Sequence, residues 1–248
     1  MQPWILPLLA GPFVGSFLGV VIRRLPQGRP VALARSECES CGSPLAARDL
    51  VPLGSYLVLR GRCRRCASPI PGFHPAVELA ALGIAAAAAA VFPDRPDALW
   101  LACGLGWTLL ALGWIDWDHL FLPDAITLPL VVAGLVATWW TVPEALTGHA
   151  VGAAAGYAAF RGVALAYRAW RGRDGLGQGD AKLLAAAGAW LGWEALPDIV
   201  FVAALLGLAY AAARALRQGG LDASERLPFG PCLAVALWLC WVRSNGAT

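Results

Sequence analysis

Four cysteines form the most specific chemical pattern in this chain. Cys38 and Cys41 make one C-x2-C pair, Cys63 and Cys66 make a second, and 21 residues separate the two pairs. Each pair offers two thiolates from one tight turn, and two such turns complete the tetrahedral sulfur site that Zn²⁺ prefers. Because four thiolates leave no open coordination position, the pattern predicts a structural rather than a catalytic zinc. Two disulfides are the alternative interpretation.

The segment that carries these cysteines is strongly basic. Residues 23–73 contain nine arginines, and arginine-rich loops between hydrophobic helices are retained on the cytoplasmic side of a membrane. The cytoplasm is reducing, so thiols there stay free to bind metal. The sequence therefore predicts a cytoplasmic zinc-binding loop.

Two acidic clusters supply a second set of reactive groups. Asp116 ends a long apolar run, and Asp180 follows the glycine-rich run G-x-G-x-G. Carboxylates beside apolar helices are costly and are functional candidates for that reason. Two such carboxylates that share one proton can hydrolyse a peptide bond, one as general base on water and the other as proton donor to the carbonyl oxygen. We predict this aspartic-protease chemistry for Asp116 and Asp180.

Other polar residues in these clusters have ordinary structural interpretations. Asp124 follows a proline and is expected to be a helix N-cap, while Asp118 is expected in solvent. His119 is a candidate proton shuttle or a polar filler. Lys182 either favours ionisation of Asp180 or extends to the membrane surface. The glycine spacing does not match a phosphate-binding loop.

The composition indicates a membrane protein. The chain has 248 residues, of which 58% are apolar and only 14% charged, and its mean hydropathy is +0.62. A soluble domain usually carries about 25% charged residues. We predict an all-α polytopic membrane protein with about eight transmembrane helices and a small cytoplasmic zinc-binding loop. The expected spans are 3–22, 75–92, 98–115, 124–141, 147–167, 197–216 and 228–243, and a shorter stretch at 180–193 makes eight if it spans.

Alternation of these spans predicts the domain organisation and topology. With 23–74 as a cytoplasmic zinc-binding domain, 1–22 is a first transmembrane helix and 75–248 a helical peptidase bundle. Both acidic clusters then reach the same membrane face as the zinc loop, and most remaining arginines, in 168–180 and 214–227, lie on that side too. Arg23 and Arg24 follow the first apolar run in place of a cleavage motif, so we expect a retained helix. Its glycines at four-residue spacing favour either packing within the bundle or a groove for a substrate helix.

Taken together, these motifs resemble the type IV prepilin leader peptidase/N-methyltransferases, which are intramembrane aspartic proteases of the GxGD kind. The resemblance rests on motifs that occur in order along nearly the whole chain. They are Gly15–Leu18 and Val20–Pro26, the two cysteine pairs, Asp49–Pro52, Leu59–Arg64, Pro75–Leu79, Ile115–Asp124, Gly177–Ala186 and Leu227–Pro231.

The resemblance implies a specific activity. Asp116 and Asp180 match the catalytic pair of the family, which removes the basic leader of type IV prepilins or pseudopilins at the cytoplasmic face of the bacterial inner membrane, in type IV pilus or type II secretion systems. Many members then methylate the new N-terminal residue with S-adenosylmethionine. The expected partners are therefore these precursors and the lipid bilayer, with no nucleic acid. A peptidase without methyl transfer and a non-enzymatic zinc-loop scaffold are the alternatives.

The methyl-donor or substrate site is predicted less directly. Its candidates are Gly61, Arg62 and Glu78, near the zinc loop, and Lys182 beside Asp180. The chain also departs from the family pattern at four positions, most of them in the part of the chain associated with methyl transfer. These are Gly19, Glu39, Tyr56 and His74.

Overall fold

The computed structural model describes residues 2–31, 35–172, 175–218 and 227–246. These residues are mostly helical and include no β-strand, only two isolated β-bridges, so the predicted all-α class is confirmed. Parts of the two arginine-bearing loops, 173–174 and 219–226, lie outside the described residues. The chain forms two compact units, Met1–Ala111 and Leu112–Thr248.

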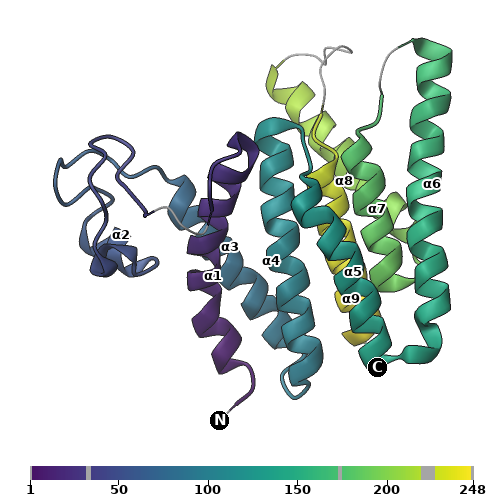
Figure 1. Ribbon diagram of the computed structural model, residues 1–248, viewed down its shortest axis with the longest axis horizontal. Coiled ribbons are helices and arrows are strands. Elements are labelled where there is room, and N and C mark those ends of the chain that lie inside the picture. Colours follow the sequence, from purple (N-terminus) through teal and green to yellow (C-terminus); the bar gives the residue numbers. More distant parts are fainter. Residues whose placement is uncertain (1, 32–34, 173–174, 219–226, 247–248) are drawn as a thin grey trace. The chain divides into compact units, whose positions relative to one another are not determined.

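A helix corresponds to each expected span (Figure 1). The α-helices are α1 (Ile5–Arg24), α2 (Gly54–Val58), α3 (Phe73–Val91), α4 (Pro96–His119), α5 (Asp124–Thr141), α6 (Leu146–Arg171), α7 (Gln178–Leu191), α8 (Leu196–Gln218) and α9 (Gly230–Gly246). Short 3₁₀ helices are η1 (Leu25–Gln27), η2 (Ala47–Leu50) and η3 (Pro143–Ala145).

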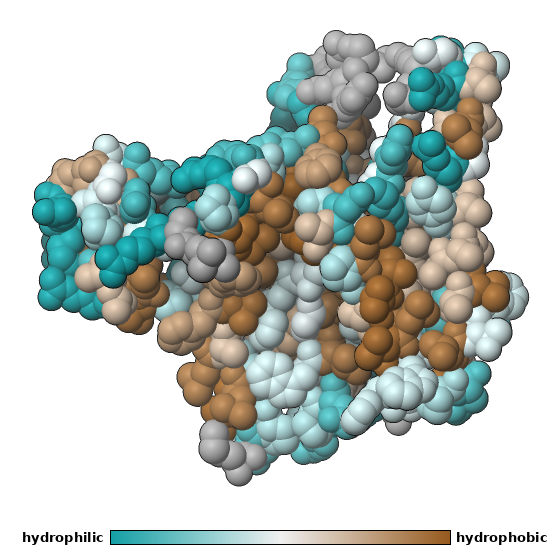
Figure 2. Space-filling model, in the orientation of Figure 1, coloured by the Kyte–Doolittle hydropathy of each residue, from teal (hydrophilic) through white to brown (hydrophobic). Residues whose placement is uncertain are grey.

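Within the described residues, five helices have both the length and the composition of a membrane span, where the sequence predicted about eight. They are α1 with η1, α3, α4, α5 and α8. Helices α7 and α9 have 14 and 17 residues, fewer than the roughly 20 that cross a bilayer. Apolar side chains gather over the long helices, and hydrophilic ones gather over residues 25–72, the cysteine insert between α1 and α3 (Figure 2).

Glycines on α1 allow it to pack closely against α3 in the first unit. A Cβ atom placed on Gly15 would lie 2.6 Å from the Cα atom of Glu78, and one on Gly11 would lie 3.1 Å from the Cα atom of Leu82. The two backbones are therefore in direct contact, as is typical of small residues in membrane helices. Of the two interpretations of the glycine stripe, packing within the bundle is the one that the structure shows.

Helix α7 lies at the centre of the second unit. Ten of its 14 residues are buried, and it packs against α5, α6, α8 and α9. The contact with α6 is the closest, because a Cβ atom on Gly188 would lie 2.2 Å from the carbonyl carbon of Gly152. On the α5 side, Trp190 Nε1 donates a 2.9 Å hydrogen bond to the carbonyl of Leu130. These contacts hold α7, and with it Asp180, on several sides.

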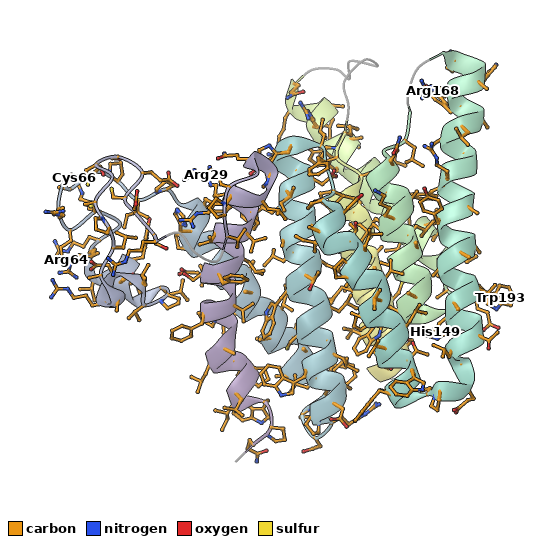
Figure 3. All side chains as sticks on the ribbon, in the orientation of Figure 1. Arg29, Arg64, Cys66, His149, Arg168 and Trp193 are labelled. Atoms are coloured by element: carbon orange, nitrogen blue, oxygen red, sulfur yellow. The ribbon has the colours of Figure 1, made fainter. Side chains whose placement is uncertain are left out.

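A histidine on α6 connects α5, α6 and α7 through polar contacts. His149, labelled in Figure 3, places Nδ1 2.8 Å from the Thr138 hydroxyl of α5 and 3.0 Å from the Ala189 carbonyl of α7. Buried polar groups are stabilising when they are paired in this way. The end of α7 remote from Asp180 is thus also fixed.

Candidate active site and metal centre

Asp116 lies near the end of α4 and is buried, with 7% of its surface exposed. Its Oδ2 atom accepts a 2.9 Å hydrogen bond from the backbone N–H of Gly230, the first residue of α9. A Cβ atom on Gly230 would lie only 2.6 Å from the same oxygen. Only glycine lets α9 begin this close to the carboxylate. Gly230 stood out in the sequence as part of a motif, but nothing in the sequence indicated its partner.

Asp180 is the third residue of α7 and is equally buried, at 8% exposure. Its Oδ2 atom accepts a 3.2 Å hydrogen bond from the backbone N–H of Gly177, the N-cap residue of the helix. An acidic side chain at this position satisfies an N–H group that the helix leaves unpaired, and the helix dipole favours its negative charge. The G-x-G-D motif therefore positions its own aspartate.

The other glycines of this motif permit close contacts and have no positive φ angles. A Cβ atom on Gly175 would lie 2.4 Å from the ring of Tyr167, and one on Gly179 would lie 2.6 Å from Cβ of Leu122. Leu122 belongs to the first acidic cluster. Gly179 thus brings the start of α7 against the α4–α5 connection.

The structure brings the two acidic clusters together within the second unit. Asp116 is close enough for its charge to act on Asp180, and Lys182 forms an ion pair with Asp124 across the two clusters. The expected N-cap role of Asp124 is wrong, because the N-cap of α5 is Pro123 and no side chain caps that helix. Asp124 instead pairs with Lys182 of α7, a helix that is distant in sequence.

Asp118 and His119 of the first cluster take no part in the contacts between the two acidic clusters. Asp118 and His119 are exposed, because they follow Asp116 on a different side of the last turn of α4. Cys232 of α9 lies within electrostatic range of Asp116. Its place in the sequence, two residues after Gly230, is the only signal that could have indicated this.

The four sulfur atoms of the cysteine insert lie within 4.8 Å of one another. Each C-x2-C pair with its turn is called a knuckle. Cys38 of the first knuckle and Cys66 of the second have their Sγ atoms 3.9 Å apart. Zinc–sulfur bonds of about 2.3 Å in a tetrahedron separate the sulfurs by about 3.8 Å, so these four residues fit the metal. All four are free thiols in the structure, which favours the metal over the disulfide interpretation.

The two knuckles repeat one backbone pattern. In each, the N–H of the first cysteine donates to the serine that follows the knuckle, at 2.9 Å to the carbonyl of Ser43 and 2.8 Å to that of Ser68. The hydroxyl of each serine lies 2.9 or 3.0 Å from the sulfur of the second cysteine. The residue after that cysteine has a positive φ angle, +65° at Gly42 but +57° at Ala67, which is not a glycine.

Hydrogen bonds favour the thiolate form of two of the four cysteines, and the thiolate is the form that binds metal. The backbone N–H groups of Cys41 and Ser40 lower the pKa of the Cys38 thiol to about 6. The side-chain hydroxyl and backbone N–H of Ser68 lower the pKa of the Cys66 thiol. The insert thus provides two thiols that ionise readily.

The candidate residues for the methyl-donor site lie around α2 and α3, apart from Lys182 in the second unit. Gly61 has a φ angle of +68°, and a Cβ atom there would lie 3.0 Å from the Tyr56 hydroxyl. Arg62 is exposed. Glu78 is buried and accepts a 2.7 Å hydrogen bond from the backbone N–H of Leu53. Glu78 therefore attaches α2 to α3.

Two of the departures from the family pattern contact each other. The Nε2 atom of His74, at the start of α3, lies 3.5 Å from the Oε1 atom of Glu39 in the first knuckle. The two substitutions together form a polar contact between the knuckle and the helix. The sequence identified both positions but gave no reason to pair them.

The comparisons with known proteins agree with this arrangement. Residues 9–92 match the bacterial peptidase A24 N-terminal domain, and residues 103–212 match the type IV leader peptidase family. The chain is 42% identical to a prepilin leader peptidase/N-methyltransferase of Burkholderia pseudomallei strain 1026b, over 92% of this chain and 81% of the relative. It is 36% identical to the protein of that name from Aeromonas hydrophila, over 99% and 93%. No solved structure matches the chain.

The fold and the site define a multi-pass helical membrane protein with a buried pair of aspartates and a four-cysteine insert. The two family matches and the long, similar relatives then settle the family. The chain belongs to the prepilin leader peptidase/N-methyltransferase family and is an enzyme of that family. The family predicted from the sequence motifs is confirmed.

Proposed function

We propose that this protein cleaves the leader from type IV prepilins or pseudopilins, with Asp116 and Asp180 as the catalytic pair, and then methylates the new N-terminus. One observation carries the proposal. Two buried carboxylates from different helices lie within electrostatic range of each other, and each accepts a hydrogen bond from a glycine N–H. The two carboxylates lie in a helical bundle that carries the motifs of the prepilin leader peptidase family, and the substrate class is proposed from that family.

The pair would act with one proton between its two carboxyl groups. The ionised carboxylate removes a proton from water as the water oxygen attacks the scissile carbonyl carbon, and the protonated carboxyl donates its proton to the carbonyl oxygen. The tetrahedral intermediate collapses when the C–N bond breaks, the leaving nitrogen takes a proton from the pair, and one hydroxyl of the intermediate returns a proton to the pair as the new carboxyl group forms. The products are a leader with a new carboxyl terminus and a mature chain with a free amine. The Gly230 and Gly177 N–H groups hold the two side chains in place.

Methyl transfer must follow cleavage, because the amine does not exist before the peptide bond breaks. S-adenosylmethionine would supply the methyl group: the amine nitrogen would bond to the methyl carbon as the bond from that carbon to sulfur breaks, S-adenosylhomocysteine would leave, and the amine would lose a proton. Gly61, Arg62, Glu78 and Lys182 remain the proposed contacts for the donor or the substrate. Cys38, Cys41, Cys63 and Cys66 would hold a structural Zn²⁺ that fixes the fold of the cysteine insert. The nine arginines of residues 23–73 favour a cytoplasmic orientation in the inner membrane for the insert and the active site.

The test is one assay with two readouts. The purified full-length protein is incubated with a prepilin and S-adenosylmethionine, and mass spectrometry then measures both the cleaved fraction and the methylated fraction of the new N-terminus. Asp116→Asn and Asp180→Asn should each lower the cleavage rate by at least about 10³-fold, because each removes a group that transfers protons in the reaction.

Asp118→Asn is the matched control, since Asp118 is exposed and only two residues from Asp116. This variant should cleave at the wild-type rate, and all three variants should insert into membranes normally. Near-normal cleavage by either Asp116→Asn or Asp180→Asn would remove that residue from the catalytic pair. A product that is cleaved but never methylated would leave the protein as a peptidase alone.

A further inference from the structure

We propose that α2 anchors the cysteine insert in the headgroup region of an anionic lipid bilayer, the same membrane that α1 and α3 cross. The anchor consists of Leu57 and Val58, with the exposed arginines Arg48 and Arg60 beside them. The proposal concerns a contact with lipid, and it does not depend on which reaction the protein catalyses.

The first observation is an exposed apolar pair on a polar insert. Leu57 is 73% exposed and Val58 is 78% exposed. The contacts of this segment involve other residues: Tyr56 lies against Gly61, and Leu53, directly before α2, is bonded to α3. Leu57 and Val58 thus contribute nothing to the core of the insert. Adjacent exposed apolar side chains are typical of surfaces that meet a partner or a membrane.

The second observation is that α2 is attached to a candidate membrane helix. The Leu53 N–H, directly before α2, donates to the Glu78 carboxylate at 2.7 Å, and Glu78 comes five residues after Phe73, where α3 starts. Helix α3 has the length and composition of a membrane span. The next residue of α3, Leu79, is 55% exposed, so α2 starts beside a surface suited to lipid.

The third observation is the charge around α2. Helix η2, which contains Arg48 and Asp49, packs beside α2, and Asp49 binds Arg64 at 2.8 Å. Arg64 lies on the cysteine insert near α2 (Figure 3), and Arg60 directly follows the helix. Arginines beside an apolar tip match the negative charge of anionic phospholipids. The same charge repels the basic leader of a prepilin, so the surface favours lipid over substrate.

Photo-crosslinking of the full-length protein in lipid nanodiscs tests the anchor. The photoreactive residue p-benzoyl-phenylalanine replaces Leu57, and mass spectrometry measures phospholipid adducts after irradiation. Phe13, which is 62% exposed on the membrane helix α1, is the positive control, and Ala46, exposed on the insert outside α2, is the negative one. In phosphatidylglycerol nanodiscs we expect the adduct yield at Leu57 to exceed that at Ala46 by about fivefold or more, as for a helix in the interface.

Charge and folding are controlled separately. In phosphatidylcholine nanodiscs, or with the substitutions Arg48→Gln and Arg60→Gln, the yield at position 57 should fall at least about twofold while the yield at position 13 is unchanged. Unaltered thermal unfolding shows that the labelled variants are folded. A yield at position 57 equal to that at position 46 would overturn the proposal. Adducts at position 57 with an added prepilin or a second copy of the chain, in place of lipid, would overturn it as well.

Discussion

The position of the Asp116 carboxylate depends on a glycine that is 114 residues away in sequence. Gly230→Ala keeps the backbone N–H donor but adds a Cβ atom 2.6 Å from Oδ2 and 2.8 Å from Cγ of Asp116. The carboxylate must therefore move, and a displacement of about 1 Å can cost roughly 10²-fold in rate. We expect prepilin cleavage by Gly230→Ala to fall by about that factor, as measured by single-turnover kinetics.

Gly207→Ala provides the comparison, because a Cβ atom there would come no closer than 3.7 Å to Phe229. This variant should cleave at the wild-type rate. A shifted pH–rate profile in Gly230→Ala, with unchanged thermal unfolding, would indicate that Gly230 acts through Asp116. Wild-type kinetics in Gly230→Ala would show that the carboxylate tolerates displacement.

At the scale of helices, the contact between α6 and α7 is the most demanding in the second unit. Gly188→Ala places a Cβ atom 2.2 Å from the backbone of Gly152, which has no side chain that could move aside. The two helices must separate, and overpacking of this kind costs about 1–3 kcal/mol. We expect a lower midpoint of thermal unfolding in detergent, together with slower cleavage, because Asp180 lies on the same helix.

Gly162→Ala on α6 tests whether the effect is specific to the contact. A Cβ atom at that position meets nothing within 4 Å, and alanine favours helix over glycine by up to about 1 kcal/mol. Unfolding of Gly162→Ala should therefore be unchanged or slightly delayed. Equal destabilisation by both substitutions would contradict the importance of the close contact.

The helices themselves were largely predictable from sequence, since long apolar runs bounded by charged residues indicate spans without any knowledge of their neighbours. The cysteine site was predictable because its ligands are close in sequence and their spacing is tied to one geometry. Contacts between distant helices were not. Asp124 illustrates the limit: its local sequence predicted an N-cap, but a lysine 58 residues away takes the carboxylate. The stretch at 180–193 was already short for a span in the sequence, and α7 has only 14 residues.

At the scale of the whole molecule, the division into two compact units predicts a local response to metal removal. The cysteine site lies wholly in Met1–Ala111, and Asp180 lies in Leu112–Thr248. A structural metal contributes folding energy to the region that binds it. After chelation of zinc, we expect hydrogen exchange to increase across residues 36–70 while α7 stays protected. Renewed addition of zinc should reverse the change.

Elemental analysis of the purified protein establishes the starting point for that measurement, with about one zinc per chain expected for a four-cysteine site. Loss of protection in α7 after chelation would show that the metal stabilises both units together. A protein that contains no zinc and has paired cysteines would reverse the proposed orientation of the insert, because disulfides form outside the reducing cytoplasm.

The alanine at position 67 makes the two halves of the proposed metal site unequal in backbone strain. An L-residue with a left-handed backbone costs about 1 kcal/mol or more, whereas glycine at the equivalent position of the first knuckle adopts it freely. A difference of about 1 kcal/mol corresponds to roughly a fivefold change in an opening equilibrium. Cys41 and Cys66 are both exposed, so the backbone difference decides between them, and Cys66 should be the first ligand to detach. Competing thiols and oxidants would reach the metal through the second knuckle, while Cys38 and Cys41 still retain it.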